Sequence, residues 1–170
     1  HSANMVNTST PNRFMTLKGW KTEHAVKDKN VLTGAHVDTQ KSDYLTITTG
    51  WDGFAQKLAD YKVYQTIDLP RGVYEFTANF GNYEGEANGC YLIAMKGDTL
   101  ACTADLFTSV NSVLAYKAMD SKSAVSSNSI HFIVSEPTTI SIGLLANMQG
   151  SQCLSLRSFN LVQYPLLPFE

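Results

Sequence analysis

The sequence predicts an all-β fold, an antiparallel β-sandwich of the jelly-roll type with about eight or nine strands and one or two short helices. Three observations predict it. Residues 64–82 contain two runs of alternating apolar and polar side chains on either side of a Pro70-Arg71-Gly72 turn. Charged residues make up 16% of the chain, against roughly 25% in most soluble domains, and 31 residues are Ser or Thr, which suit strands and turns. No amphipathic helix of about 10 to 15 residues alternates with the strands, which excludes a parallel α/β fold.

The N-terminal third is predicted to contain a flexible leader, two strands and a short helical turn. Residues 1–13 are polar and lack periodicity, so they are expected to form a flexible leader before a single domain over residues 14–164. Residues 14–20 predict the first strand, and the charged stretch after them predicts a surface connection. Residues 44–49 predict the second strand, and the four-residue spacing of Phe54 and Leu58 favours a short helical turn.

The two runs in residues 64–82 predict a hairpin. In the second run, Tyr74, Phe76 and Ala78 share one face and alternate with polar or smaller side chains. Pro70 fixes its own φ and Gly72 can adopt a positive φ, so the residues between the runs are suited to a tight turn.

Beyond the hairpin, residues 90–96 predict a strand that ends in a Gly97-Asp98 turn, and a short helix is expected within residues 109–119. Three further strands are predicted near the C-terminus, at residues 129–135, 138–146 and 153–164. The last strand places Leu154 and Leu156 on one face but continues with Phe159 and Leu161. This change of parity predicts a β-bulge at Arg157-Ser158. Residues 165–170, with two prolines, are expected to form a tail.

Charge and hydropathy limit the partners. The net charge is −2 with a pI near 6.1 and no run of like charges, so the chain lacks the basic surface that nucleic-acid binding requires. No apolar stretch approaches the roughly 18 residues of a membrane span. We therefore expect neither a nucleic-acid partner nor a membrane span in this chain.

The three cysteines, Cys90, Cys102 and Cys153, lack the spacing of a zinc site or of a CxxC redox motif. Cys90 and Cys153 each open a strand-like run and are expected to be small buried side chains. A Cys90–Cys153 disulfide is the alternative, and at least one thiol must remain unpaired.

Several segments together resemble a known pattern. They are GWD (50–52), YQTIDLPRGVYEFT (64–77), KGDTL (96–100), VLAYKA (113–118), IHFIV (130–134), TTISIGLLAN (138–147) and LRSFNLVQY (156–164). In this order they are similar to a galactose-binding-like domain of unknown function, akin to carbohydrate-binding modules, from secreted or surface lipoproteins of glycan-degrading Bacteroidetes. The resemblance covers about residues 14–164.

The resemblance implies a fold, an extracytoplasmic location and a role beside polysaccharide-utilisation proteins. A poly- or oligosaccharide is the implied ligand, and other surface glycan-uptake proteins are implied partners. It implies no catalytic residue. Fold alone does not determine function, so the candidate site must come from individual side chains.

Trp51 and Asp52 are the first candidates for saccharide binding. They follow the strand at 44–49 and are flanked by Gly50 and Gly53, so an indole face and a carboxylate can be held at a loop rim. The alternative is structural, with Trp51 closing one end of the sandwich and Asp52 capping the turn that follows.

The loop at residues 82–89 offers Tyr83, Glu84, Glu86 and Asn88 beside two glycines, which suits a sugar or a hard cation. A solvated loop is the alternative. The resemblance also implies that Asp98, Glu84 or Glu86 can contribute to a structural calcium site, but the sequence identifies no metal or cofactor.

Asn147, Gln149 and Gln152 lie in the loop before the last strand and can supply amide hydrogen bonds to hydroxyls; an ordinary polar turn is the alternative. His24 and His36 are expected in connecting segments and His131 within a strand, without metal-ligand spacing.

No nucleophile or nucleotide-binding motif is present, so we expect a non-catalytic saccharide-binding or accessory domain. Two other functions stay open, namely a spacer or protein-interaction module without a sugar ligand, and a glycan hydrolase on the same scaffold.

Overall fold

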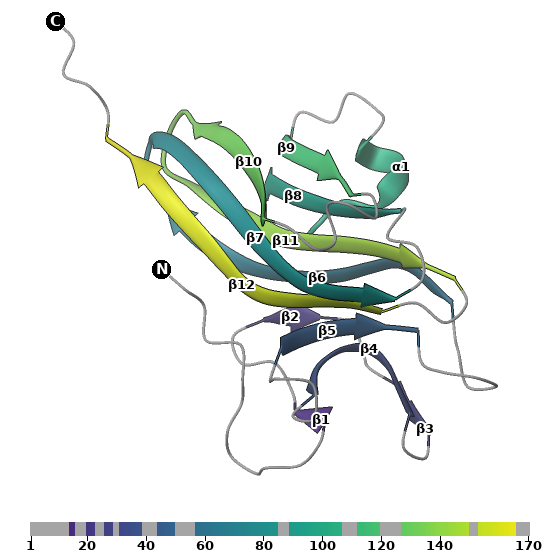
Figure 1. Cartoon of the computed structure of the whole chain (residues 1–170). Coiled ribbons are helices and arrows are strands. Elements are labelled where there is room, and N and C mark those ends of the chain that lie inside the picture. Colours follow the sequence, from purple (N-terminus) through teal and green to yellow (C-terminus); the bar gives the residue numbers. More distant parts are fainter. Residues whose placement is uncertain are drawn as a thin grey trace, which may run out of the picture.

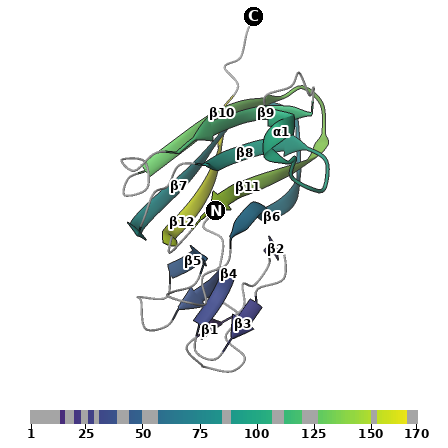
Figure 2. The ribbon, with the colours of Figure 1, turned by 90° about the vertical axis from the view of Figure 1, so that its right-hand side faces the viewer.

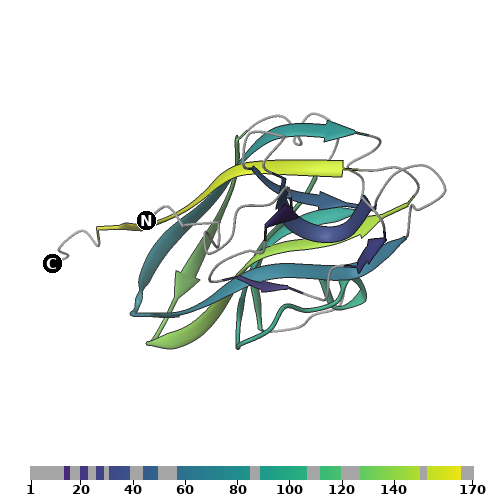
Figure 3. The same ribbon diagram turned by 90° about the horizontal axis from the view of Figure 1, so that it is seen from below.

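The structure of the chain is a computed structural model. It describes residues 14–15, 20–22, 26–28, 31–38, 44–49, 57–84, 89–106, 112–119, 127–149 and 153–165. Within these residues two antiparallel sheets pack face to face, which confirms the predicted β-sandwich (Figure 1). The long strands of both sheets lie roughly along one common axis (Figure 3).

The seven-stranded sheet has the order β1-β4-β5-β12-β7-β10, with β3 paired to β4. Its strands are β1 (Phe14–Met15), β3 (Val26–Asp28), β4 (Val31–Asp38), β5 (Tyr44–Thr48), β7 (Gly72–Glu84), β10 (Ser127–Val134) and β12 (Cys153–Tyr164). The N-terminal strands of this sheet gather at one edge (Figure 2).

The five-stranded sheet has the order β2-β6-β11-β8-β9. Its strands are β2 (Lys21–Thr22), β6 (Leu58–Leu69), β8 (Cys90–Lys96), β9 (Val113–Ala118) and β11 (Thr138–Met148), and the helix α1 spans Thr103–Leu106. The main core lies between the two sheets, and Phe76, Leu92 and Ile140 within it are fully buried.

The predicted hairpin at residues 64–82 is wrong, although both of its strands are present. β6 pairs with β2 and β11, whereas β7 pairs with β10 and β12, so the Pro70-Arg71 turn carries the chain from one sheet to the other. The Tyr74 hydroxyl donates a hydrogen bond of 2.7 Å to the Pro70 carbonyl and holds this arch. The alternation of apolar and polar residues could not distinguish a hairpin within one sheet from an arch between two sheets, because each strand buries one face in either arrangement.

The predicted bulge in the last strand is confirmed. In the pairing of β12 with β7, Leu156 lies opposite Phe80 and Ser158 opposite Asn79, so Arg157 is the extra residue. The exposed Arg157 accommodates the change of parity, and Leu156 and Phe159 both stay buried.

The helical turn expected before Tyr61 is wrong over the residues that the structure describes, because β6 begins at Leu58. Asp60 has a positive φ of 49°. The pairing of β6 with β11 is irregular beside it, between Ala146 and Met148. As a result Leu58 and Tyr61, three residues apart, are both buried. Phe54, whose spacing from Leu58 predicted the turn, lies outside the described residues.

Two other expectations for local structure are wrong. The stretch after Trp20, predicted as a connection, contains β2 and β3, and His36 lies in β4 rather than in a connecting segment. β3 is short and charged, as edge strands often are, so its sequence resembles a loop. The helix expected within residues 109–119 is replaced by β9, an edge strand whose residues are mostly half-buried, whereas the helix α1 occurs earlier in the chain.

A second, smaller core lies on the outer side of the five-stranded sheet. Leu100 and Leu106, from the segment that contains α1, cover Ile93, Met95 and Leu145. This cover blocks much of that outer face. The structure describes no helix over the outer face of the seven-stranded sheet.

All three cysteines are in the thiol form, so the structure does not form the alternative Cys90–Cys153 disulfide. Both of these residues are buried, as predicted, and Cys102 is half-buried. Burial raises the pKa of the Cys90 thiol to about 11.

Native-state alkylation checks this arrangement. At about pH 8 we expect iodoacetamide to modify Cys102, and Cys90 and Cys153 only after unfolding, because a buried protonated thiol is a poor nucleophile. Since the folded pKa of Cys90 is raised, its contribution to stability is present below about pH 9 and is lost as the pH rises toward 11. Mass spectrometry that finds Cys90 modified as fast as Cys102 in the native protein would contradict the burial.

Among the described residues, no helix has the length and apolar character needed to cross a membrane.

Candidate functional site

Three segments that carry the predicted saccharide-binding residues start and finish at the same end of the sandwich. Thr48 at the end of β5, Cys153 at the start of β12 and Glu84 at the end of β7 are aligned in neighbouring strands. On the other sheet, Met148 at the end of β11 lies opposite Leu58 at the start of β6. This loop end, on the right in Figure 1, therefore collects the β5–β6, β7–β8 and β11–β12 connections.

Most of the predicted side chains themselves lie outside the described residues. These are Trp51, Asp52, Glu86, Asn88 and Gln152. Tyr83 and Glu84 are placed as backbone in β7, opposite Leu154 and Cys153, without a description of their side chains. Their roles, and those of the five others, stay predictions.

Asn147 is described, and its amide is engaged within the chain. Its side-chain nitrogen donates to the Gly89 carbonyl and to the Thr103 hydroxyl, both at 2.8 Å, and its oxygen accepts from the Asp60 backbone N–H at 2.9 Å. These bonds link β6, β11, the start of β8 and α1. Asn147 thus supports the frame beneath the loop end, and Gln149, two residues further on, is exposed.

Asp60 is the second member of this frame, and no sequence pattern indicated it. Its carboxylate accepts from the Thr103 backbone N–H at 2.8 Å and from the Thr103 hydroxyl at 2.5 Å. The hydrogen bond from the Thr103 hydroxyl is the main cause that lowers the pKa of Asp60. The stability that this carboxylate contributes is therefore present at neutral pH and is lost as the pH falls through its folded pKa.

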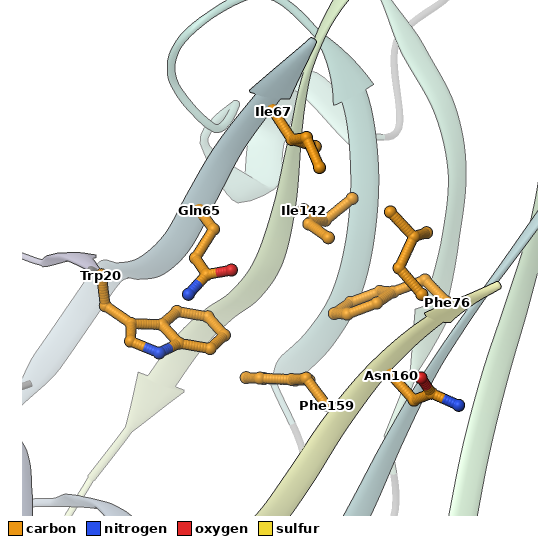
Figure 4. A pocket seen from close by; sticks show the side chains of 8 residues that line it. Trp20, Gln65, Ile67, Phe76, Ile142, Phe159 and Asn160 are labelled. Carbon is orange, nitrogen blue, oxygen red and sulfur yellow. The ribbon is translucent and has the colours of Figure 1, made fainter. Parts of the chain in front are cut away.

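A narrow slot opens between the two sheets on the side where β6 and β12 lack neighbours along part of their described length. It has a volume of about 110 Å³ and is lined by Trp20, Gln65, Ile67, Phe76, Ile142, Phe159, Asn160 and Leu161. Figure 4 shows the indole of Trp20 and the side chains of β6 on one side, facing Phe76 and Phe159 on the other. The Trp20 and Phe159 ring centroids are 4.6 Å apart.

The slot is too small to enclose a sugar ring. It is smaller than the engineered apolar cavity of roughly 150 Å³ that holds benzene, and a pyranose is larger than benzene. The Nε1 atom of Trp20 is buried without a hydrogen-bond partner, although its ring packs well. The slot is therefore a partly open edge of the hydrophobic core, and the Trp20 ring packs over it.

Other exposed aromatic and acidic residues have ordinary surroundings. Tyr116 is 42% exposed on β9 and packs edge-on against Tyr91. Asp98 is exposed in the turn after β8. Within the described part of the chain, no group of three or more His, Cys, Asp or Glu residues is arranged to hold a metal ion. His24 lies outside that part.

Comparison with known proteins places the chain in a family. Residues 2–143 match the model of a domain of unknown function, DUF5013. The chain belongs to the DUF5013 family. This confirms the membership of a family of unknown function that the sequence predicted. No curated protein sequence matches this DUF5013 domain.

Solved structures similar to the DUF5013 domain include two carbohydrate-binding modules. One is TmCBM61 in complex with β-1,4-galactotriose, with 13% identity, a TM-score of 0.48, and coverage of 86% of this chain and 90% of that chain. The other is the module CBM6cm-2 from Cellvibrio mixtus lichenase 5A in complex with cellotriose, with 11% identity, a TM-score of 0.30, and coverage of 84% and 87%.

Proposed function

We propose that this DUF5013 domain is a non-catalytic saccharide-binding domain whose ligand lies across the loop end. The observation that supports the proposal is the convergence of the β5–β6, β7–β8 and β11–β12 connections at one end of the sandwich. The strand ends that flank three segments far apart in the sequence, each with aromatic, amide or carboxylate side chains, thereby lie at the same end.

The chemistry of these segments suits a sugar. Trp51 and Tyr83 supply ring faces for the apolar C–H faces of a pyranose, and Asp52, Glu84, Glu86, Asn88, Gln149 and Gln152 supply partners for its hydroxyls. The Asp60–Asn147–Thr103 hydrogen bonds fix the strand ends beneath them. A ligand held on such a rim is bound weakly, because much of its surface stays in water.

The cellular setting is part of the same proposal. The sequence resemblance to domains of surface lipoproteins supports an extracytoplasmic accessory module that holds a polysaccharide near uptake proteins or degrading enzymes. No metal or cofactor is required for this role.

Substitution of the two aromatic residues tests the loop end. We expect Trp51→Ala and Tyr83→Ala each to weaken retention on the cognate polysaccharide by about tenfold in affinity gel electrophoresis, because each removes a ring face that stacks on the sugar. The melting temperature should change little. Tyr116→Ala, which removes an exposed ring elsewhere, is the matched control and should not change retention. Unchanged retention in both loop variants would remove these residues from the site.

A further inference from the structure

The outer face of the seven-stranded sheet carries a second set of ordered side chains. Three neighbouring strands, β10, β7 and β12, place alternate residues on this face, and their registers align these residues in rows across the sheet. The twelve outward positions are Ser127, Ser129, His131, Ile133, Val73, Glu75, Thr77, Asn79, Ser158, Asn160, Val162 and Tyr164. We call this surface the outer-face array.

An aromatic and acidic cluster lies at one end of the outer-face array. The Tyr164 hydroxyl donates to Glu75 Oε2 at 2.8 Å, and His131 Nε2 lies 2.6 Å from the same oxygen. The Tyr164 and His131 rings are nearly parallel, with 14° between their planes and 6.2 Å between their centroids. The cluster therefore presents two ring faces and a carboxylate whose position is fixed from both sides.

The cluster is open to solvent. Tyr164 is 40% exposed and the His131 side chain 60% exposed, and Ile133 beside them is 66% exposed. The hydrogen bond from Tyr164 lowers the pKa of Glu75, which stays ionised at neutral pH, and the Glu75 carboxylate raises the pKa of Tyr164. Both rings are thus held in a fixed orientation without being covered.

Hydroxyl and amide groups continue from the cluster along the strands. Thr77 and Ser129 share a hydrogen bond of 2.8 Å, and the Asn79 amide donates to the Ser158 hydroxyl at 2.8 Å. Each of these hydroxyls still has capacity for a further hydrogen bond. From Val73 to Asn79 the array is about 20 Å long at a rise of about 3.4 Å per residue, which suits an extended ligand of several sugar rings.

The charge of the outer-face array selects among ligands. Among its twelve positions there is one carboxylate, one histidine and neither Lys nor Arg. An acidic polysaccharide or another polyanion would find neither Lys nor Arg among these twelve positions and would be repelled by Glu75; the exposed Arg157 lies beside Ser158, at the other end of the array from Tyr164. Hydroxyls of a neutral sugar can donate to Glu75 and exchange hydrogen bonds with the Ser, Thr and Asn groups.

We propose that the outer-face array is a second saccharide-binding surface, which takes a neutral glycan chain with one ring against Tyr164 and His131. It shares the ligand class of the proposed function but none of its residues. Strand register places it away from the loop end, since Tyr164 lies opposite Val73 at the start of β7, whereas the loop end follows Glu84. The two surfaces allow one domain to hold two segments of a polysaccharide.

Affinity gel electrophoresis tests the second surface with soluble galactan, xylan and mixed-linkage glucan as neutral probes and polygalacturonate as the anionic probe. We expect at least one neutral probe, and not polygalacturonate, to retard the wild-type protein. Tyr164→Ala should weaken that retardation by about tenfold, because it removes both the ring face and the donor that orients Glu75. Tyr164→Phe keeps the ring and should cost less, about two- to threefold. Tyr116→Ala is the control and should behave as wild type.

The outcomes separate this inference from the loop-end proposal. If Tyr164→Ala loses retardation by the neutral probe while Trp51→Ala and Tyr83→Ala keep it, the result supports the outer-face array and contradicts the loop-end proposal. Loss in the loop variants with wild-type behaviour of Tyr164→Ala overturns the inference and leaves the proposed function intact. Loss in both sets supports both surfaces. Equal loss in Tyr164→Ala and Tyr116→Ala, retardation by polygalacturonate alone, or no retardation by any probe overturns the inference.

Discussion

Replacement of Phe76 by Ala is expected to lower the free energy of unfolding by about 3 to 5 kcal/mol, the range for removal of a large buried aromatic side chain. Phe76 lies in β7, between β12 and the edge strand β10, and is fully buried. Its ring stacks on Phe159 with centroids 5.1 Å apart, beside the slot that Trp20 covers. The cavity left by truncation would join this slot and enlarge the gap between the two sheets.

Urea denaturation of the wild type and of Phe76→Ala measures the loss. Phe76→Leu is the matched control, because it keeps an apolar side chain at the same position and should cost clearly less than the Ala variant. A loss below about 1 kcal/mol in Phe76→Ala would mean that the two sheets are not packed against each other at this point. Saccharide retention should survive in either variant under conditions where it is folded.

Gly143→Ala is the second substitution with a large expected effect, a loss of about 3 kcal/mol or more, at the upper end of overpacking costs. Gly143 lies in the middle of β11 and faces Tyr64 of β6 and Ile93 of β8 across the sheet. A Cβ atom there would lie 2.1 Å from the Val63 carbonyl oxygen and 2.6 Å from the Tyr64 Cα. Both are backbone atoms of a paired strand, so relief requires displacement of β6.

Gly72→Ala is the matched control for this prediction. A Cβ at Gly72 would meet the amide nitrogen of Gln163 at 2.6 Å, which is the far end of a flexible side chain that can turn aside. Gly72 is buried, but this contact can move aside, so we expect a change within about 0.5 kcal/mol. Thermal unfolding that gives similar melting temperatures for Gly143→Ala and Gly72→Ala would contradict the close approach of β6 and β11.

The sequence predicted the structure best where the two-residue alternation of side chains along a single strand determines it. The alternation in residues 73–80 gave the buried face of β7, and the parity change after Leu156 gave the bulge at Arg157. Both follow from the fixed period of a strand, which does not depend on its partner. The pairing of β6 and β7 does depend on partners, and the arch at Pro70 therefore could not be separated from a hairpin.

The candidate sites show the same division. Loop composition indicated Trp51, Tyr83 and Asn147 as binding residues, but only strand register showed that the strands flanking their segments end on the same side of the sandwich. Asp60 and Thr103, 43 residues apart, have no sequence pattern that links them. Glu75, His131 and Tyr164 likewise have no sequence pattern that links them, because outward positions on three strands are recognised as neighbours only once the register is known.

A glycan array with the wild-type protein tests whether this DUF5013 domain binds saccharide on exposed surfaces. We expect binding to neutral oligosaccharides, with no signal for polyanionic glycans. An array with no neutral glycan above background would contradict the claim and would favour a spacer or protein-interaction module.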